Sequence, residues 1–227
     1  MTNFFRYILN ITVLFVVTGL CVSCGENGAL KERTVYFHED HAKWMTPMEP
    51  GDQFLVQDCN GVTQSFMMRE DNYYFGKSWG SFLFVNTDML HTEYHYQSFG
   101  SLFGLSYSQS LTANEAPFGD ELYITMEDVA FAYDLTVGVV SRIYCGFGNK
   151  SMLMTDQGYE EQEPIYSEVV IRDTMVIGGQ TYQEVLHFVL ADFEESWEPY
   201  TPAELFVAKG AGFVRCIFAG GMVLTRK

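Results

Sequence analysis

Basic residues are scarce in this chain, which has 227 residues with 13 Lys and Arg against 29 Asp and Glu and a net charge of −16. Proteins that bind nucleic acid neutralise its phosphates with clustered Lys and Arg. Because the few basic residues here are scattered, nucleic acid is excluded as a partner class. The acidic excess also disfavours anionic lipid surfaces and favours neutral or cationic ligands.

Several motifs that mark enzymes are absent as well. The sequence contains no S-x-x-K pair, no H-E-x-x-H zinc-protease motif and no P-loop. No apolar pattern of the i, i+3, i+4, i+7 type persists for three turns, so long helices are not expected. An enzyme is therefore the less favoured class.

The N-terminal leader is the most informative segment. It contains the basic residue Arg6, an apolar run over residues 7–20, and the ending Cys21-Val22-Ser23-Cys24. This pattern resembles a bacterial lipoprotein signal peptide, in which the peptidase cuts before a lipidated cysteine. The resemblance implies that Cys24 begins the mature protein and carries the lipid.

Two other interpretations of the leader stay open. An ordinary secretory signal would be cleaved without lipidation, whereas a transmembrane helix needs roughly 20 mostly apolar residues. The apolar run covers about 14 residues and is interrupted by polar ones, which disfavours a permanent span. Cys21 is a weaker lipidation site than Cys24, because bulky Leu20 precedes it whereas small Ser23 precedes Cys24.

Cleavage before Cys24 would leave 204 residues with a net charge of −17, because the leader holds one basic residue and no acidic one. That length suits one domain, and no Pro- or Ser-rich hinge divides it. We expect a signal peptide over residues 1–23, a lipidated flexible tether over 24–34 and a single β domain over 35–227.

Three further cysteines, Cys59, Cys145 and Cys216, would remain after cleavage. Outside the cytoplasm a disulfide is possible, but three cysteines permit three alternative single pairings, and their spacing selects none. No two of them form a C-x-x-C pair that would indicate a structural zinc site. Small buried side chains are the simplest expectation for each.

Glycine-rich turns indicate antiparallel hairpins. Asn-Gly and Gly-Gly tolerate positive φ and favour two-residue loops. In the hairpin around Gly178-Gly179, such a loop would place Asp173 opposite Glu184, an unfavourable pair of like charges. A bulge or tight bend is expected at 209–212. The expected hairpins are 52–69 around Asn60-Gly61, 167–190 around Gly178-Gly179 and 212–226 around Ala219-Gly220-Gly221.

Runs rich in Phe, Tyr, Val, Ile and Thr add further candidate strands. These are 82–86, 90–99, 101–111, 121–127, 129–135 and 139–145. About ten strands exceed a comfortable flat sheet. We therefore predict an all-β fold, an antiparallel curved sheet that closes into a lipocalin-like barrel or half-barrel, with a sandwich as the alternative. One short helix is expected near 197–204.

The C-terminal quarter supports this fold class. The turn at Gly178-Gly179, the strand Thr181-Tyr-Gln-Glu-Val-Leu-His-Phe188 and the segment 204–215 follow one another in order. This arrangement resembles the C-terminal part of uncharacterised β-rich bacterial envelope lipoproteins. The resemblance implies a fold and no chemical role.

The sharpest candidate for chemistry is His91-Thr92-Glu93-Tyr94-His95. On a strand, His91, Glu93 and His95 share one face and offer two imidazoles and a carboxylate to a metal such as Zn²⁺. The alternative, which we favour, is a solvated polar face, because Tyr94 would point the other way as on a half-exposed antiparallel strand. A short H-x-E-x-H pattern arises often by chance.

Other histidines are weaker candidates. His38-Glu39-Asp40-His41 places possible ligands at adjacent positions, which face opposite ways on a strand and converge only if the backbone turns. We interpret that segment as a polar entry loop. His187, between Leu186 and Phe188, is expected to be partly buried with one hydrogen bond.

Aromatic residues gather between positions 73 and 107. They suit the core of a curved sheet. Alternatively, Trp79, Tyr94 and Tyr96 would line a cavity for an apolar ligand or a platform for a sugar ring.

Composition and leader together predict a lipid-anchored protein of the bacterial envelope, held at the outer membrane and facing the periplasm or the exterior. The favoured function is a non-catalytic binding or scaffolding module for a hydrophobic ligand, a glycan or an envelope partner, with no cofactor. One alternative is a metal-dependent hydrolase built on His91, Glu93 and His95, with Zn²⁺ as its metal. The other is a purely structural envelope protein.

Overall fold

The computed structural model describes most of the chain after residue 30. The described ranges are 31–82, 85–101, 104–114, 119–127, 129–145, 152–155, 158–161, 167–190 and 199–227. The leader, with Cys24, and residues 25–30 lie outside them. Residues 31–34, expected in the tether, belong instead to strand β1 (Lys31–Val35), because β1 pairs with β4 (Val85–Ser101) and so satisfies its backbone groups.

The chain divides into two compact units. One unit contains residues 1–33 and 78–90, which include the start of β1 and the adjoining parts of β3 (Thr63–Phe82) and β4. The other contains residues 34–77 and 91–227. The hydrophobic core clusters lie in this second unit.

Strands make up nearly all regular structure in the described ranges, as predicted. The described residues also contain α2 (Glu39–Ala42), a helix of a single turn. No described helix has the length and hydropathy needed to cross a membrane. The helix expected near 197–204 is wrong for its described part, where strand β13 begins at Pro202. The remaining strands are β2 (Gln53–Asp58), β5 (Ser106–Thr112), β6 (Glu121–Met126), β7 (Val129–Asp134), β8 (Val139–Cys145), β9 (Met152–Thr155), β10 (Gly158–Glu161), β11 (Ser167–Ile177), β12 (Gln180–Leu190), β13 (Pro202–Ala208), β14 (Gly212–Phe218) and β15 (Val223–Arg226).

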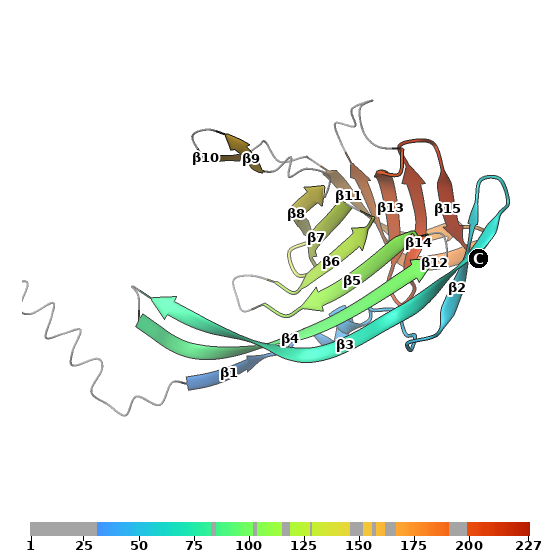
Figure 1. The fold of residues 1–227 in the computed structure, drawn as a ribbon. Coiled ribbons are helices and arrows are strands. Elements are labelled where there is room, and N and C mark those ends of the chain that lie inside the picture. The colour runs from blue at the N-terminus through green and yellow to red at the C-terminus, as the bar shows by residue number, and fades with distance from the viewer. Residues whose placement is uncertain are drawn as a thin grey trace, which may run out of the picture. The chain divides into compact units, whose positions relative to one another are not determined.

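Thirteen of the described strands form one sheet, in which β1 pairs only with β4 and the others follow the order β11-β12-β13-β14-β15-β2-β3-β4-β5-β6-β7-β8. This antiparallel sheet curls through 267° into a half-barrel, which confirms the predicted fold class (Figure 1). Its end strands β8 and β11 approach each other, with Cα atoms within 8 Å. A closely curled sheet of this kind encloses a core on its inner face, and the larger of the two core clusters includes residues of β2 to β7 and of β12 to β15.

The first hairpin forms where Asn60-Gly61 predicted it, but its loop has three residues rather than two. Asp58 pairs with Val62, and only Gly61 of the loop has positive φ, at 84°. Oδ1 of Asp58 accepts the backbone N–H groups of Asn60 (2.9 Å) and Val62 (2.7 Å). These bonds favour a three-residue turn with a glycine bulge over the two-residue form.

The hairpin of β11 and β12 has the predicted two-residue Gly178-Gly179 loop, with φ values of 61° and 84°. The register that this loop sets would place Asp173 opposite Glu184, as expected. Glu184 adopts a φ of 48°, and its carboxylate pairs with Lys209 at 2.9 Å. The left-handed backbone and the ion pair with Lys209 accommodate the like charges.

Large side chains fill the described interior of the half-barrel. Rings stack across it, with Phe66 and Phe213 centroids 5.9 Å apart and Phe131 and Phe188 centroids 4.9 Å apart. The largest side chains with less than 2% exposure are Tyr107, Tyr133, Phe66, Phe99, Phe131, Phe188, Phe213, Phe218, Met68, Leu111, Leu122 and Ile124. Packing of this density leaves little room around these residues for a ligand.

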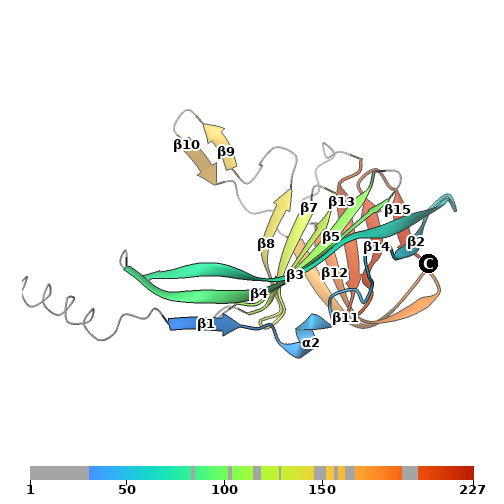
Figure 2. The same cartoon turned by 60° about the horizontal axis from the view of Figure 1, so that its bottom comes forward.

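Residues 36–46, which we name the strap, cross the half-barrel before β2 and include α2, seen at the bottom of Figure 2. Thr46 is 3% exposed, and its backbone N–H and C=O bond to the side-chain amide of Gln97 on β4 at 2.9 and 2.8 Å. Gln109 on β5 donates to Thr46 Oγ1 at 3.0 Å. Gly210, between β13 and β14, donates its N–H to Lys43 O at 2.7 Å. The strap therefore links strands that are far apart in the sheet order.

Candidate functional site

The alternation predicted for His91-Thr92-Glu93-Tyr94-His95 is confirmed on β4, but its polar face is not solvated. Glu93 is 6% exposed, and its carboxylate accepts the N–H of Phe37 at 2.8 Å and the hydroxyl of Tyr73. The expectation of a solvated face is wrong here because the strap covers this part of β4. The bond to the Glu93 carboxylate raises the pKa of Tyr73 to about 12.

Two of the three residues proposed as metal ligands, Glu93 and His95, are engaged with different partners. His95 Nε2 lies 2.6 Å from Asp71 Oδ1 on β3, whereas Glu93 bonds to Phe37 and Tyr73. Within the described ranges, no group of three or more His, Cys, Asp or Glu side chains has a geometry that would hold a metal ion. In the described contacts, His95 and Glu93 therefore bind other parts of the protein, Asp71 for His95 and the strap and Tyr73 for Glu93.

Two of the predicted aromatic ligand residues, Tyr94 and Tyr96, lie on the opposite face of β4. Tyr94 packs against Tyr74, with ring centroids 4.7 Å apart, and Tyr74 is 50% exposed. Tyr96 is half-buried. Trp79 lies in β3, but its side chain is outside the described residues. Tyr94 and Tyr74 thus form an aromatic pair on the outside of the sheet and line no interior cavity.

His187 and the described cysteines have ordinary structural settings. His187 Nε2 lies 2.7 Å from Glu204 Oε2, and its ring stacks on Phe206, which confirms the expected single hydrogen bond of a partly buried histidine. Cys216 is a buried free thiol whose pKa is raised by burial, and Cys59 is free and exposed. The side chain of Cys145 is outside the described residues.

Gly76-Lys77-Ser78-Trp79-Gly80 has the spelling of a G-x-S-x-G motif, although no nucleophile elbow of this type is expected from the sequence. The motif requires a sharp turn between a strand and a helix that exposes the serine. Here all five residues lie within β3. Its backbone is thus that of a strand and gives Ser78 no nucleophile elbow.

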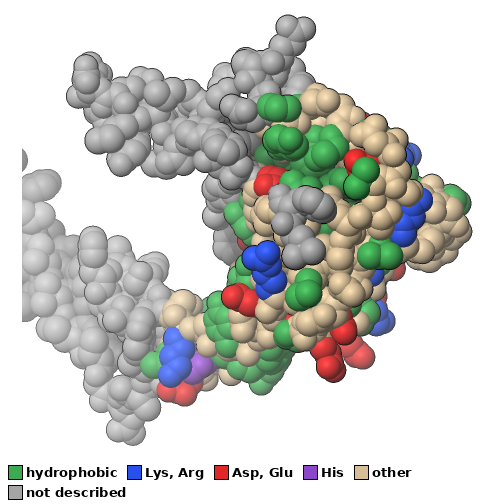
Figure 3. Space-filling view, turned by 45° about the vertical axis from the view of Figure 1, so that its right-hand side comes forward, with side chains coloured by type: hydrophobic (Ala, Val, Ile, Leu, Met, Phe, Trp, Pro, Cys, Tyr) green, Lys and Arg blue, Asp and Glu red, His purple; other side chains and the backbone are tan. Residues whose placement is uncertain are grey.

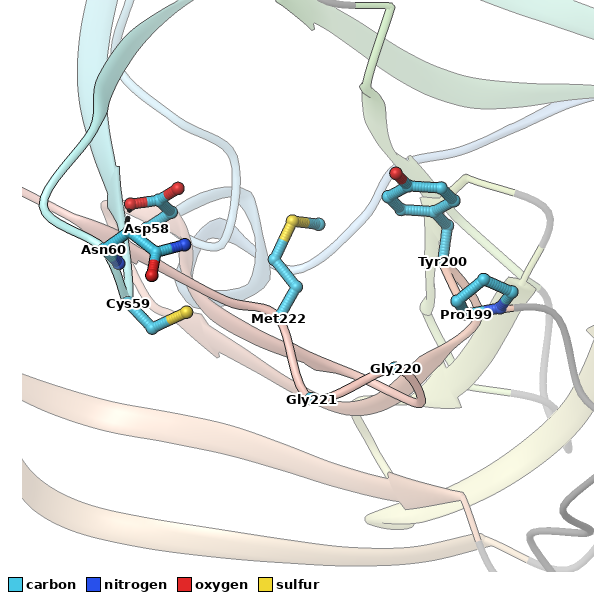
Figure 4. Close-up of a pocket in the computed structure, with 8 residues that line it drawn as sticks. All are labelled: Asp58, Cys59, Asn60, Pro199, Tyr200, Gly220, Gly221 and Met222. Atoms are coloured by element: carbon cyan, nitrogen blue, oxygen red, sulfur yellow. Dashed lines mark hydrogen bonds between the residues drawn. The ribbon is translucent and has the colours of Figure 1, made fainter.

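One hollow in the described surface lies between the β2–β3 and β14–β15 turns, and we name it the turn hollow (Figure 4). Its volume is about 340 Å³. Met222 lies between the Cys59 turn and Tyr200 in this view. Asp58 bonds to its own turn, and the N–H of Gly220 donates to Pro199 O at 2.9 Å. The Asp58 carboxylate and the Gly220 N–H, two polar groups of the turn hollow, are thus already engaged in hydrogen bonds that stabilise the turns.

A second hollow, which we name the rim hollow, lies where the strap meets the β6 and β7 end of the half-barrel and has a volume of about 540 Å³. Its lining residues are Tyr36, His38, His41, Asn114, Gly119, Asp120, Leu135 and Thr136. This set combines an exposed aromatic ring with several polar side chains. Few, well-placed polar groups beside an aromatic surface are typical of ligand sites.

Asp120 organises the rim hollow. It is 6% exposed, and its Oδ2 accepts the N–H of His38 at 2.7 Å and lies 2.6 Å from His41 Nδ1. The single turn of α2 brings the His38 and His41 rings together, with centroids 5.3 Å apart. The polar entry loop expected here is therefore a helical turn, and adjacent residues converge because its backbone turns.

Sequence reasoning missed Asp120 as a functional candidate. It is separated from His41 by 79 residues, and no local pattern connects them. The available signal was the pair of histidines three residues apart, which meet on a helix but not on a strand.

The charge around the rim hollow is acidic. Glu39 and Asp40 lie in α2, and Asp134 accepts the N–H groups of Gly119 and Thr136 at 3.2 and 2.8 Å. On the face of the molecule in Figure 3, basic side chains stand apart from one another and form no single patch. A site with these neighbours disfavours anionic ligands.

Comparisons with known proteins give no indication of function, so a function can be argued only from the contacts described above. No protein-family model, no curated protein and no solved structure matches this chain.

Proposed function

We propose that this chain is a lipid-anchored, non-catalytic binding or scaffolding module of a bacterial envelope, attached to the outer membrane and facing the periplasm or the exterior. The leader that ends at Cys24 supports the anchor through its resemblance to lipoprotein signal peptides. Each buried methylene of an attached chain contributes about 0.8 kcal/mol to membrane binding, so two or more chains hold a protein stably.

The filled interior is the observation that supports the binding mode. Lipocalin-like barrels hold hydrophobic ligands inside, but here rings such as Phe66, Phe131 and Phe188 occupy the described interior with less than 2% exposure. Exposed aromatic side chains lie at the surface instead, with Tyr36 65% exposed and Tyr73 55% exposed. A glycan or an envelope partner bound at the surface therefore fits better than a hydrophobic molecule held inside.

Membrane fractionation with intact-mass analysis tests the anchor. The native protein should begin at an acylated Cys24 and sediment with membranes. The Cys24→Ser variant should lose the acyl mass and leave the membrane fraction. An unacylated native N-terminus, or identical fractionation of the two proteins, would contradict the anchor.

Titration with oleate, followed by native mass spectrometry, tests the binding mode. We expect no stoichiometric complex, because the described interior is packed. One oleate bound per protein, lost on narrowing the interior further by Val56→Leu, would show an interior site and overturn binding at the surface. Exposed Val176→Leu is the matched control, since it changes volume outside the core.

A further inference from the structure

The rim hollow is lined by side chains that suit a polar ligand. The functional argument above gives these side chains no role. Tyr36 provides an exposed ring at one side, and Phe75 holds that ring from behind in an edge-on contact with centroids 5.7 Å apart. Phe75 in turn contacts Tyr73 at 6.0 Å. This chain of ring contacts fixes the platform before a ligand arrives, which lowers the entropic cost of binding.

The polar side of the hollow is equally fixed. His41 meets Asp120 through Nδ1, so the geometry of the imidazole ring directs its Nε2 away from that carboxylate. The two contacts of Asp120 described above, with the His38 N–H and with the His41 ring, both involve its Oδ2 atom. Asn114 is held by donating its Nδ2 to Gly119 O at 2.9 Å. Imidazole, amide and carboxylate groups together both donate and accept hydrogen bonds, as a hydroxyl does.

Charge narrows the ligand class. Asp120 is a buried lining residue of the hollow, and Asp134 accepts the N–H of Gly119, another lining residue. A phosphate or carboxylate ligand would face these carboxylates without a Lys or Arg among the residues that line the hollow. A neutral ligand with many hydroxyls and one apolar face meets both the polar wall and the ring of Tyr36.

We propose that the rim hollow binds a neutral saccharide, with a sugar ring stacked on Tyr36 and its hydroxyls bonded to His41 and Asn114. The inference rests on the proposed function, since it names the ligand class of that binding module. In this proposal the ring of Tyr36 supplies most of the contact area. His41, which Asp120 orients, supplies a directional hydrogen bond to a sugar hydroxyl.

Isothermal titration of the acylated protein in detergent micelles tests the proposal, with chitotriose and maltotriose as neutral probes and trigalacturonate as the anionic probe. At least one neutral trisaccharide should bind, and trigalacturonate should not. Tyr36→Ala should weaken binding at least tenfold. The matched control is Tyr200→Ala, which removes a ring of 60% exposure from the turn hollow and should leave binding unchanged.

Three results would overturn the saccharide site. They are failure of both neutral trisaccharides to bind at 10 mM, wild-type binding by Tyr36→Ala, and an equal loss in Tyr200→Ala. Thermal melting of each variant shows that an affinity change is not a folding defect. Because acylation and fractionation at Cys24 are measured separately, a missing saccharide site leaves the proposed anchor standing.

Discussion

Tyr73 is half exposed, yet its hydroxyl donates to the buried carboxylate of Glu93. This bond is the main cause that raises the pKa of Tyr73 to about 12, from the ordinary value of 10.0. Because the pKa is higher in the folded than in the unfolded state, the protonated tyrosine stabilises the fold fully below pH 10. That contribution is lost as the pH rises from 10 through 12.

The titration of Tyr73 can be measured by NMR on protein labelled with ¹³Cζ-tyrosine, with Tyr73→Phe to assign the resonance. We expect a midpoint about two pH units above that of free tyrosine. Glu93→Gln removes the charged acceptor and should lower the midpoint. A Tyr73 resonance that titrates near pH 10 in the unaltered protein would show that the hydroxyl does not bond to Glu93 in solution.

The turns of the sheet differ in how much space surrounds their glycines. Gly212 and Gly221 both have positive φ, at 69° and 83°. A Cβ added at Gly212 would overlap Thr46 Oγ1 of the strap, whereas one at Gly221 would meet no heavy atom within 4 Å. Alanine should therefore cost about 1 kcal/mol at either site for its left-handed backbone, and about 1–3 kcal/mol more at Gly212 for overpacking.

Urea unfolding of Gly212→Ala and Gly221→Ala measures this difference, since the backbone cost largely cancels between them. The larger loss of unfolding free energy in Gly212→Ala is the free-energy cost of displacing the strap. Equal free energies of unfolding for the two variants would mean that Thr46 does not pack against this turn.

The elements themselves could largely be predicted from sequence, because the signals of a hairpin are local. Gly178-Gly179 predicted both strands, and their register followed once the loop proved to have two residues. Asn60-Gly61 gave the hairpin but the wrong loop length, because the side chain of Asp58 competes for the turn. The covered face of Glu93 and the contact of His41 with Asp120 depend on partners 56 and 79 residues away. No local pattern carries that information.

At the scale of the whole molecule, the strap joins the two halves of the half-barrel. Glu93, Gln97 and Asp120 hold it from the β4 to β6 half, and the Gly210 N–H holds it from the β13–β14 turn. Since the proposed lipid lies at Cys24, before β1 and the strap, a pull on the anchor would reach the sheet first through the pairing of β1 with β4 and then through these bonds. The strap thus contributes to the core, and in the proposed anchored protein it would lie between the lipid and most of the sheet.

Gln97 is the most informative position for testing that role. It is 1% exposed, and replacing it by Leu leaves the backbone N–H and C=O of Thr46 without these partners. Each buried unpaired group costs about 1–3 kcal/mol, so the loss of partners for these two groups should lower the free energy of unfolding of Gln97→Leu by about 2–6 kcal/mol. Exposed Gln183→Leu on β12 is the matched control and should change it by less than about 0.5 kcal/mol.

Hydrogen exchange separates a loosened strap from a general loss of stability. In Gln97→Leu, the amide of Thr46 and the Gly210 amide, which bonds to Lys43 O, should exchange faster by a larger factor than the amides of β14, because the strap detaches before the sheet opens. A uniform acceleration across the strap and β14 would show that the strap and the sheet open as one unit. Unchanged exchange at Thr46 would show that the bonds to Gln97 do not hold the strap in solution.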